Sequence, residues 1–394
     1  MSQTKNHIQN GSCPVYKKCG GCQLQNLSYP EQLRFKQSKV IKLLKGFGRV
    51  QPIIGMDNPY HYRNKVQAAF FTNRQGRIVS GVYQSGTHHI VGIDSCQIED
   101  VLADKIIVAV RKLLPSFRLT TYNEDTGKGF LRHVLVKRGF ATNEVMLVLV
   151  TGSAIFPSKN HFVKEIVKQF PQITTVVQNV NPYRTNLVLG DKQTVLYGSG
   201  TIEDILCGCR FRISPKSFYQ INPVQTEILY NKAMEFADLK GNETVLDAYC
   251  GIGTIGIVAA KRGAGQVIGV ELNGDAVRDA KQNAKANGLQ NIRFYKDDAG
   301  AFMQAVAEEG EHLDVVMMDP PRAGSSVPFL NALIQLSPET VVYISCNPET
   351  LARDLHYLQR HSNYRVRSIQ PVDMFPHTAH VESVVLISRV GSRQ

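Results

Sequence analysis

The sequence has no long hydrophobic stretch, no internal repeat and no low-complexity segment. Its longest uninterrupted apolar run, Val145–Val150, is far shorter than the roughly 18 residues that a membrane-spanning helix needs. With 394 residues, the chain is long enough for two domains and a sizeable core. We therefore expect a soluble, cytoplasmic protein of two or more domains.

Acidic residues are scarce in the first 75 positions. Only Glu31 and Asp57 stand there against twelve Lys and Arg, a local charge of +10 in a chain whose total is +12. Within this segment, residues 29–45 predict a helix with Leu33, Val40 and Leu44 on an apolar stripe. The basic residues placed elsewhere around this helix are Arg34, Lys36, Lys39, Lys42 and Lys45. Such a segment is either a solvated face or a surface for a polyanion.

Aromatic and basic residues recur together, which favours RNA as that polyanion. Residues 60–65 read Tyr-His-Tyr-Arg-Asn-Lys, and residues 130–133 read Phe-Leu-Arg-His shortly before Lys137 and Arg138. The bases of single-stranded RNA stack on aromatic rings while cations neutralise its phosphates. We therefore expect an RNA partner. A catalytically inert RNA-binding scaffold is one class of protein that fits an RNA partner, but this interpretation leaves the reactive residues described below without a role.

Four of the eight cysteines indicate a metal centre rather than disulfides. Cys13, Cys19 and Cys22 form C-x5-C-x2-C, and Cys96 is a remote fourth thiol. A four-cysteine zinc site normally shows two paired knuckles, whereas three clustered cysteines and one remote cysteine suit an iron–sulfur cluster better. We predict a [4Fe–4S] cluster, with zinc and unmetallated thiols as alternatives. The cysteines that carry no such pattern and are interpreted as structural are Cys207, Cys209 and Cys250.

The sequence pattern changes near residue 215. Residues 60–215 contain short strand-like runs separated by glycine turns, which predicts a mostly antiparallel domain. After residue 215, strands, glycine turns and helices alternate to the end, which predicts an α/β domain with a Rossmann-like sheet. The strands predicted in the first region are residues 66–71, 132–136, 145–150 and 176–179.

A glycine-rich turn follows the predicted strand Thr244–Asp247. Gly251, Gly253 and Gly256 fit G-x-G-x-x-G, and Glu271 ends the next strand, twenty residues past Gly251. This spacing predicts a cofactor-binding turn, with Glu271 on a ribose hydroxyl pair. On this motif alone, both a nicotinamide-dependent dehydrogenase and an S-adenosylmethionine enzyme are open.

Reactive side chains follow successive apolar runs of the α/β region. Asp319 begins Asp-Pro-Pro-Arg after residues 315–318, Cys346 lies in Ser-Cys-Asn-Pro after residues 341–344, and Glu382 lies further downstream. Open α/β sheets hold their chemistry at such strand ends. A lone buried cysteine is usually inert. A soft nucleophile, an acidic anchor and a candidate base together indicate a catalytic site.

These three groups suit methylation at carbon 5 of uracil, which is too weak a nucleophile to take a methyl group unaided. Attack of a thiolate at carbon 6 produces an enolate and removes this obstacle. Cys346 is the candidate nucleophile, with its thiolate favoured by its loop position and by cations such as Arg322. Glu382 is the candidate base that removes the carbon-5 proton, and His377 and His380 are its rivals.

Two related chemistries fit residues 319–322 less well. Cytosine-5 methyltransferases of RNA carry a cysteine directly after Asp-x-Pro, where this chain has Pro321 and Arg322. Amino-group methylases place an aromatic residue where Arg322 stands and need no cysteine. A dehydrogenase has no use for such a loop or for a cysteine beside the cofactor. S-adenosylmethionine is therefore the expected cofactor.

Taken together, these motifs resemble the RNA uracil-C5 methyltransferases, in particular the branch with a four-cysteine iron–sulfur cluster that modifies 23S ribosomal RNA. The resemblance covers residues 13–389. It implies that Cys346 is the nucleophile and Glu382 the base. The cofactor-binding residues that it implies are Gln220, Tyr249, Gly251, Glu271 and Asp319. A transfer-RNA uracil methyltransferase of the same fold is the alternative.

The resemblance also implies two domains. Residues 1–23 and 58–215 would form an α+β domain that carries the cluster and binds RNA. Residues 24–57 and 216–394 would form the Rossmann-like methyltransferase domain, with 24–57 packed onto it although they come earlier in the sequence. We expect no obligate protein partner and no membrane contact.

Overall fold

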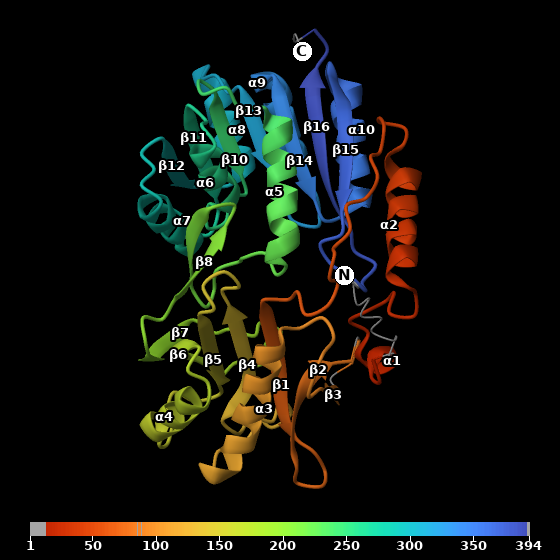
Figure 1. Cartoon of the computed structure of the whole chain (residues 1–394). Coiled ribbons are helices and arrows are strands. Elements are labelled where there is room, and N and C mark those ends of the chain that lie inside the picture. Colours follow the sequence, from red (N-terminus) through yellow and green to blue (C-terminus); the bar gives the residue numbers. More distant parts are fainter. Residues whose placement is uncertain (1–12, 85, 88, 392–394) are drawn as a thin grey trace, which may run out of the picture.

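The computed structural model describes residues 13–84, 86, 87 and 89–391, and it contains two seven-stranded sheets, one above the other in Figure 1. Two helices, α1 (Tyr16–Cys19) and α2 (Tyr29–Leu44), precede both sheets in the sequence. A small hairpin of β8 (Ile202–Leu206) and β9 (Cys209–Ile213) leads from the lower sheet to the upper one.

The lower sheet has the strand order β3-β2-β1-β4-β5-β6-β7. Its neighbouring strands are antiparallel except for β5 and β6, so the prediction of a mostly antiparallel region is confirmed. Helices α3 (Val101–Ser116) and α4 (Lys159–Gln169) pack on one of its faces. Its strands are β1 (Lys65–Thr72), β2 (Ile78–Tyr83), β3 (Ile90–Gly92), β4 (Leu131–Arg138), β5 (Val145–Thr151), β6 (Ile173–Val180) and β7 (Lys192–Tyr197).

The upper sheet has the order β12-β11-β10-β13-β14-β16-β15. Strands β10 to β14 are parallel, and β16 runs antiparallel to both β14 and β15. Its strands are β10 (Thr244–Ala248), β11 (Gln266–Glu271), β12 (Ile292–Lys296), β13 (Val315–Met318), β14 (Thr340–Ser345), β15 (Tyr364–Val372) and β16 (Glu382–Arg389). Its helices are α5 (Pro223–Ala237), α6 (Thr254–Lys261), α7 (Gly274–Ala286), α8 (Ala299–Glu309), α9 (Val327–Leu336) and α10 (Pro348–His361).

Both faces of the upper sheet are covered, because successive side chains of a strand point to opposite faces. Val315 and Met317 of β13 join one apolar cluster with α5, α6 and α7. Val316 and Met318 join a second cluster with α2, α8, α9 and α10. The predicted α/β region is therefore a three-layer Rossmann-like sandwich, and α2 is part of one of its outer layers.

Helix α2 agrees with its prediction in position but not in its polar face. It begins after Ser28, whose backbone N–H donates to Glu31 Oε2 at 2.8 Å. Val40 and Leu44 are fully buried, as the apolar stripe predicts. The placement of Lys36 among the solvated basic residues is wrong, because its side chain is fully buried. Its partner comes from the other end of the chain, which helical periodicity cannot reveal.

The two sheets are joined by packed side chains. A single apolar cluster includes Met146 and Val148 of β5, Phe211 of β9 and Val245 of β10. No helix in the described part of the chain is long and apolar enough to cross a membrane.

Candidate active site

In Figure 1, β16 runs upward to the C-terminus at the top. The parallel strands run in the opposite direction to β16, so their carboxyl ends face the lower sheet. Asp319 follows Met318, which pairs with Tyr343 of β14. Cys346 follows Ser345, which pairs with Ser383, the neighbour of Glu382 in β16. The structure therefore brings together Cys346, Glu382 and Asp319, which lie up to 63 positions apart in the printed sequence.

Burial raises the pKa values of all three groups, and repulsion between them adds to the effect at Glu382 and Cys346. Burial raises the pKa of Asp319 to about 7. The pKa of Glu382 is raised well above its usual value, first by burial and then by Asp319. Burial also raises the pKa of the Cys346 thiol to about 11, and Glu382 and Asp319 add to this effect. Arg322 lowers the pKa of Cys346 but is outweighed. The prediction of a favoured thiolate is therefore wrong for the enzyme without ligands, because burial and the two neighbouring carboxyls outweigh Arg322.

The two rival bases differ in their surroundings. His377 is held by Gln32: its ring Nδ1 lies 3.1 Å from Gln32 Nε2, and its backbone N–H donates to Gln32 Oε1 at 2.8 Å. The His377 ring also packs on Tyr60, at 4.9 Å between ring centroids, which indicates a structural role. His380 Nε2 lies 3.4 Å from Arg322 Nη2 and is therefore beside the reactive groups. Burial and nearby cations, Arg322 first, lower the pKa of His380, so it is neutral at pH 7.

The glycine-rich turn has the backbone shape that its sequence predicts. Tyr249, Gly251 and Gly253 all have positive φ, at 65°, 56° and 83°. A Cβ on Gly253 would lie 2.8 Å from the Phe294 ring, so glycine is required there. The Gly251 N–H donates to Glu271 Oε2 at 3.1 Å, which links the turn to the predicted ribose-binding acid.

Asp247, at the end of β10, is a residue that the sequence reasoning missed. The Gly256 N–H donates to its Oδ2 at 2.7 Å, whereas its Oδ1 is buried and has no hydrogen-bond partner among the described residues. Burial raises the pKa of Asp247 to about 8, and Asp319 and Glu271 add to this effect. A buried carboxyl oxygen without a partner, beside a cofactor turn, fits a ligand that completes its hydrogen bonding. An acid placed directly before the turn was the available sequence signal.

The two other predicted cofactor residues lie near the ends of α5 and β10. Gln220 is buried two positions before Asn222, the N-cap of α5, and its carbonyl accepts from Asn64 Nδ2 at 3.1 Å. The Tyr249 ring lies 5.5 Å from that of Phe329 and follows β10 directly. Tyr230 of α5 hydrogen-bonds with Thr254 in the glycine-rich turn at 3.0 Å, so α5 is anchored to this turn.

The four candidate metal-binding thiols influence one another. Neighbouring thiols contribute to the raised pKa values of Cys19, Cys22 and Cys96, and burial is the largest cause in each case. The pKa values of Cys22 and Cys96 reach about 12. Within residues 13–84, 86, 87 and 89–391, however, no group of three or more Cys, His, Asp or Glu side chains is placed to hold a metal ion. The described residues therefore support neither the predicted [4Fe–4S] site nor the zinc alternative.

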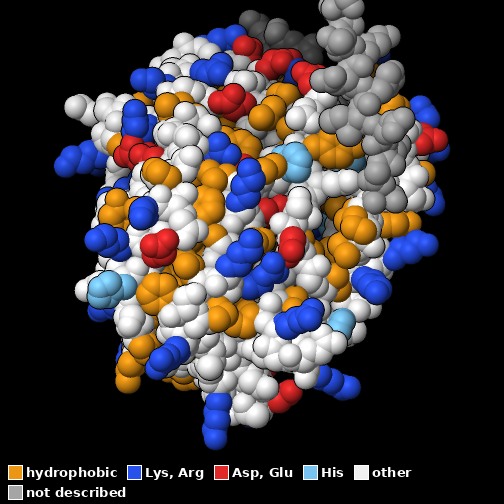
Figure 2. Space-filling view, turned by 60° about the horizontal axis from the view of Figure 1, so that its bottom comes forward, with side chains coloured by type: hydrophobic (Ala, Val, Ile, Leu, Met, Phe, Trp, Pro, Cys, Tyr) orange, Lys and Arg blue, Asp and Glu red, His pale blue; other side chains and the backbone are white. Residues whose placement is uncertain are grey.

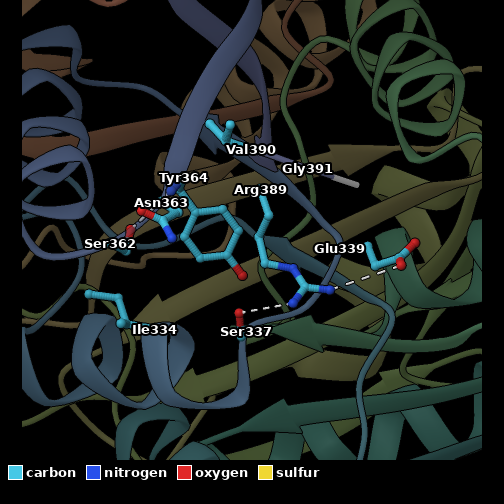
Figure 3. A pocket seen from close by; sticks show the side chains of 9 residues that line it. All are labelled: Ile334, Ser337, Glu339, Ser362, Asn363, Tyr364, Arg389, Val390 and Gly391. Atoms are coloured by element: carbon cyan, nitrogen blue, oxygen red, sulfur yellow. Dashed lines mark hydrogen bonds and ion pairs between the residues drawn. The ribbon is translucent and has the colours of Figure 1, made fainter. Parts of the chain in front are cut away.

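A pocket of about 770 Å³ lies at the opposite end of the upper sheet, away from these groups. Arg389 extends into it and interacts with Ser337 and Glu339 (Figure 3). Ser337 and Glu339 directly precede β14, whereas Cys346 directly follows it. This pocket is therefore not part of the candidate active site.

Basic side chains are spread over the surface shown in Figure 2, among apolar ones and with fewer acidic ones. The loop between β6 and β7 exposes two large apolar side chains, Tyr183 at 67% and Leu187 at 71%. Exposed aromatic and basic groups are the combination that single-stranded RNA requires.

The sequence model of the tRNA (uracil-5-)-methyltransferase family matches residues 192–390, about half of the chain. The chain belongs to this family. Relatives described as uncharacterized RNA methyltransferases span almost its whole length. One from Bacillus cereus ATCC 10987 is 46% identical over 97% of this chain and 84% of its own. One from Halalkalibacterium halodurans is 44% identical over 95% of this chain and 82% of its own.

A solved structure from the family has the same fold. The Pyrococcus abyssi tRNA (uracil-54, C5)-methyltransferase, in complex with S-adenosyl-L-homocysteine, has a TM-score of 0.78 and 29% identity over 93% of this chain and 85% of that one. The predictions of a Rossmann-like α/β methyltransferase fold, S-adenosylmethionine dependence and an RNA substrate are confirmed at the level of the family. The nicotinamide-dehydrogenase alternative is excluded.

Proposed function

We propose that this member of the uracil-5-methyltransferase family methylates carbon 5 of a uridine in 23S ribosomal RNA, with Cys346 as nucleophile and Glu382 as base. The observation that supports this most is the pairing of Ser345 with Ser383, which brings Cys346, the residue after β14, next to Glu382, the first residue of antiparallel β16. Cys346, as the thiolate that remains after its proton is lost to water, bonds to carbon 6, and the uracil becomes an enolate. Carbon 5 then takes the methyl group as the bond between that methyl and the cofactor sulfur breaks. The ionised carboxylate of Glu382 accepts the carbon-5 proton, the C5–C6 double bond re-forms and the C6–S bond breaks, which returns the thiolate.

The residues that we infer to hold S-adenosylmethionine are Gln220, Tyr249, Gly251, Glu271 and Asp319. The cofactor supplies an electrophilic methyl group when bound. Apart from the two chain neighbours of Gly251, no described residue lies within 4 Å of a Cβ position there, and this open space would let a ligand approach the backbone closely. Asp247 Oδ1, in β10 beside this turn, has no hydrogen-bond partner among the described residues. Both features fit a ligand bound at the glycine-rich turn.

A denaturing gel of protein with labelled RNA and S-adenosylmethionine tests the two catalytic roles. Cys346→Ala should form no covalent protein–RNA band. Glu382→Gln should accumulate one, because general-base help of about 10² to 10⁴ in rate is lost only after the methyl group is in place. A covalent band with Cys346→Ala would show that another residue is the nucleophile. Normal turnover by Glu382→Gln would leave His380 as the next candidate.

The choice of 23S ribosomal RNA rests on the resemblance of the cysteine quartet to that branch of the family. The Pyrococcus abyssi relative, which acts on tRNA, favours transfer RNA as a second candidate substrate. Mapping of 5-methyluridine in total RNA from cells with and without the gene distinguishes them. Loss from 23S RNA supports the first proposal, and loss from tRNA supports the second. Either substrate is consistent with a cytoplasmic enzyme.

We further infer that Cys13, Cys19, Cys22 and Cys96 bind a [4Fe–4S] cluster in a domain of residues 1–23 and 58–215, next to the methyltransferase domain of 24–57 and 216–394. Residues 1–12, 85, 88 and 392–394 of these ranges lie outside the described residues. The spacing of Cys13, Cys19 and Cys22, with Cys96 as a remote fourth thiol, supports this proposal. Binding would have to displace the protons that burial favours on Cys22 and Cys96. Anaerobically purified protein should contain iron and acid-labile sulfide. Cys96→Ser should lose both, and the matched variant Cys207→Ser should keep them. Stoichiometric zinc without sulfide would contradict the cluster.

A further inference from the structure

The buried lysine of α2 interacts with the segment that leads to Glu382. Lys36 and Asp373 form an ion pair in which both side chains are 0% exposed. Lys36 Nζ also donates to the carbonyl of Phe375 at 3.0 Å. Burying two charges costs several kcal/mol of desolvation, and an apolar pair of similar volume is often at least as stable. Stability alone is therefore a poor explanation for this pair.

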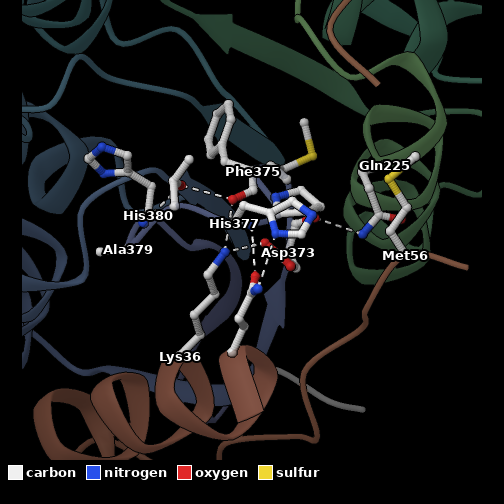
Figure 4. A network of polar contacts seen from close by, with 12 residues as sticks. Lys36, Met56, Gln225, Asp373, Phe375, His377, Ala379 and His380 are labelled. Carbon is white, nitrogen blue, oxygen red and sulfur yellow. Dashed lines mark hydrogen bonds and ion pairs between the residues drawn. The ribbon is translucent and has the colours of Figure 1, made fainter. Parts of the chain in front are cut away.

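Asp373 joins parts of the chain that are far apart in sequence. Its Oδ2 accepts from the Tyr29 hydroxyl at 3.0 Å, and its backbone N–H donates to Ile54 at 2.9 Å. Its own carbonyl accepts from Gln225 of α5 at 3.0 Å. Figure 4 shows Lys36 on α2 and Gln225 on α5 reaching this segment from different sides. Asp373 therefore connects two helices of the upper sheet to the chain between β15 and β16.

Every carbonyl from residue 373 to residue 377 accepts a hydrogen bond from a distant part of the chain, and we call these five residues the carbonyl strap. The donors, in the order of the carbonyls that they contact, are Gln225, Asn222, Lys36, Tyr62 and Leu24. These donors come from α5 and its N-cap, from α2 and from the segments before α2 and β1. Five consecutive long-range bonds fix the backbone far more closely than an ordinary surface loop requires.

Glu382 follows the strap by five residues and begins β16. We propose that Lys36 is a positioning residue that, together with Asp373, locks the carbonyl strap and thereby holds the Glu382 carboxyl beside Cys346. The ammonium is the only donor from α2 to the strap carbonyls among the bonds above, and it is also the counter-charge of Asp373. This inference rests on the proposed role of Glu382. It assigns Lys36 to the last step, in which Glu382 takes the carbon-5 proton, the C5–C6 double bond forms and the C6–S bond breaks.

Lys36→Met tests the proposal, because methionine retains most of the side-chain volume without the charge. The matched control is Lys285→Met, which makes the same substitution at an exposed position in the last turn of α7. Lys36→Met should turn over at least tenfold more slowly and retain the methylated covalent RNA adduct, as Glu382→Gln does. Lys285→Met should behave as the unmodified enzyme. If Lys36 had only a structural role, the substitution would lower the amount of adduct and the turnover rate together, in proportion to the fraction of protein that is folded.

Hydrogen exchange gives a readout that does not depend on the base. Amides of residues 373–382 should exchange faster in Lys36→Met, while those of β14 keep their protection. Unchanged exchange in 373–382 overturns the proposal, whatever the activity. If Glu382→Gln accumulates adduct and Lys36→Met does not, the positioning role is wrong and the proposed function stands. If Glu382→Gln accumulates none, the proposed base is wrong, and exchange alone decides whether Lys36 locks the strap.

A double variant covers the case in which Lys36→Met folds poorly. Lys36→Met with Asp373→Leu removes both buried charges and should restore stability. In this double variant the Phe375 carbonyl still lacks its lysine donor, so release of the adduct should remain at least tenfold slower than in the unmodified enzyme. Normal release by a folded double variant overturns the proposal.

Discussion

Cys346 should react slowly with iodoacetamide in the enzyme without ligands. Only the thiolate is alkylated, and the pKa of Cys346 is about 11 where an ordinary value is 9.0. At neutral pH, a pKa higher by two units lowers the thiolate fraction about a hundredfold. The thiol is half-buried and not sealed off, so protonation and not access should limit the rate.

The assay follows the peptide that contains Cys346 by mass spectrometry after alkylation between pH 7 and pH 10. The rate should rise about tenfold per pH unit with no plateau, because the whole range lies below the pKa. Free cysteine serves as the reference, since its rate should level off near its own pKa of about 8.5.

Arg322→Met should slow the reaction further, because Arg322 is the cation that lowers the pKa of Cys346. Arg360→Met, a change at an exposed arginine in the last turn of α10, should have no effect. A plateau below pH 8, or alkylation as fast as that of free cysteine at pH 7, would refute this reasoning. Cys346 would then be ionised in the enzyme without ligands, as the sequence alone predicts.

Two further changes probe the cofactor turn. The pKa of Asp247 is about 8 in the folded protein and near 3.8 in the unfolded chain. Between pH 3.8 and pH 8 the folded state therefore binds more protons than the unfolded state. The folded protein loses stability as the pH rises through this range. Asp247→Asn should remove this pH dependence. In urea unfolding, the free energy of unfolding of the variant should therefore rise relative to that of the unmodified protein between pH 5 and pH 8. Parallel plots of this free energy against pH for the two proteins would contradict the prediction. Gly253→Ala should cost more stability than Gly263→Ala and should abolish S-adenosylhomocysteine binding in calorimetry. Both glycines have positive φ, but only at Gly253 would a Cβ meet other atoms, with Phe294 at 2.8 Å. Equal losses in the two variants would show that the contact with Phe294 is unimportant.

Short-range patterns predicted the elements well, because the physics behind them is local. The apolar run 315–318 is β13 to the residue, and the helix expected at 29–45 is α2 with one residue fewer. The glycine spacing predicted the turn at 251–256 because only glycine tolerates the backbone and the contact with Phe294 at Gly253. Strand-end positions of Asp319 and Cys346 followed from the same local reasoning.

Long-range electrostatics could not be obtained in this way. The sequence gives Lys36 as one of several basic residues on a helix, and only the fold shows that Asp373, more than 300 positions later, lies against it. In the same way, Arg322 was weighed as the neighbour of Cys346 without Glu382 and Asp319, whose effect has the opposite sign. Charge alone was readable from the sequence, whereas burial and the identity of each neighbour required the tertiary structure.

The excess of buried carboxyls is consistent with a cationic cofactor. Burial raises the pKa values of Asp247, Asp319 and Glu382 and so disfavours their ionised forms in the site without ligands. A sulfonium bound among these groups would favour their ionised forms and would act on Cys346 in the same direction as Arg322. S-adenosylhomocysteine carries no sulfonium charge and would not do so. The protonated resting state of Cys346 is therefore compatible with nucleophilic attack, because the charge that favours the thiolate arrives with the methyl donor.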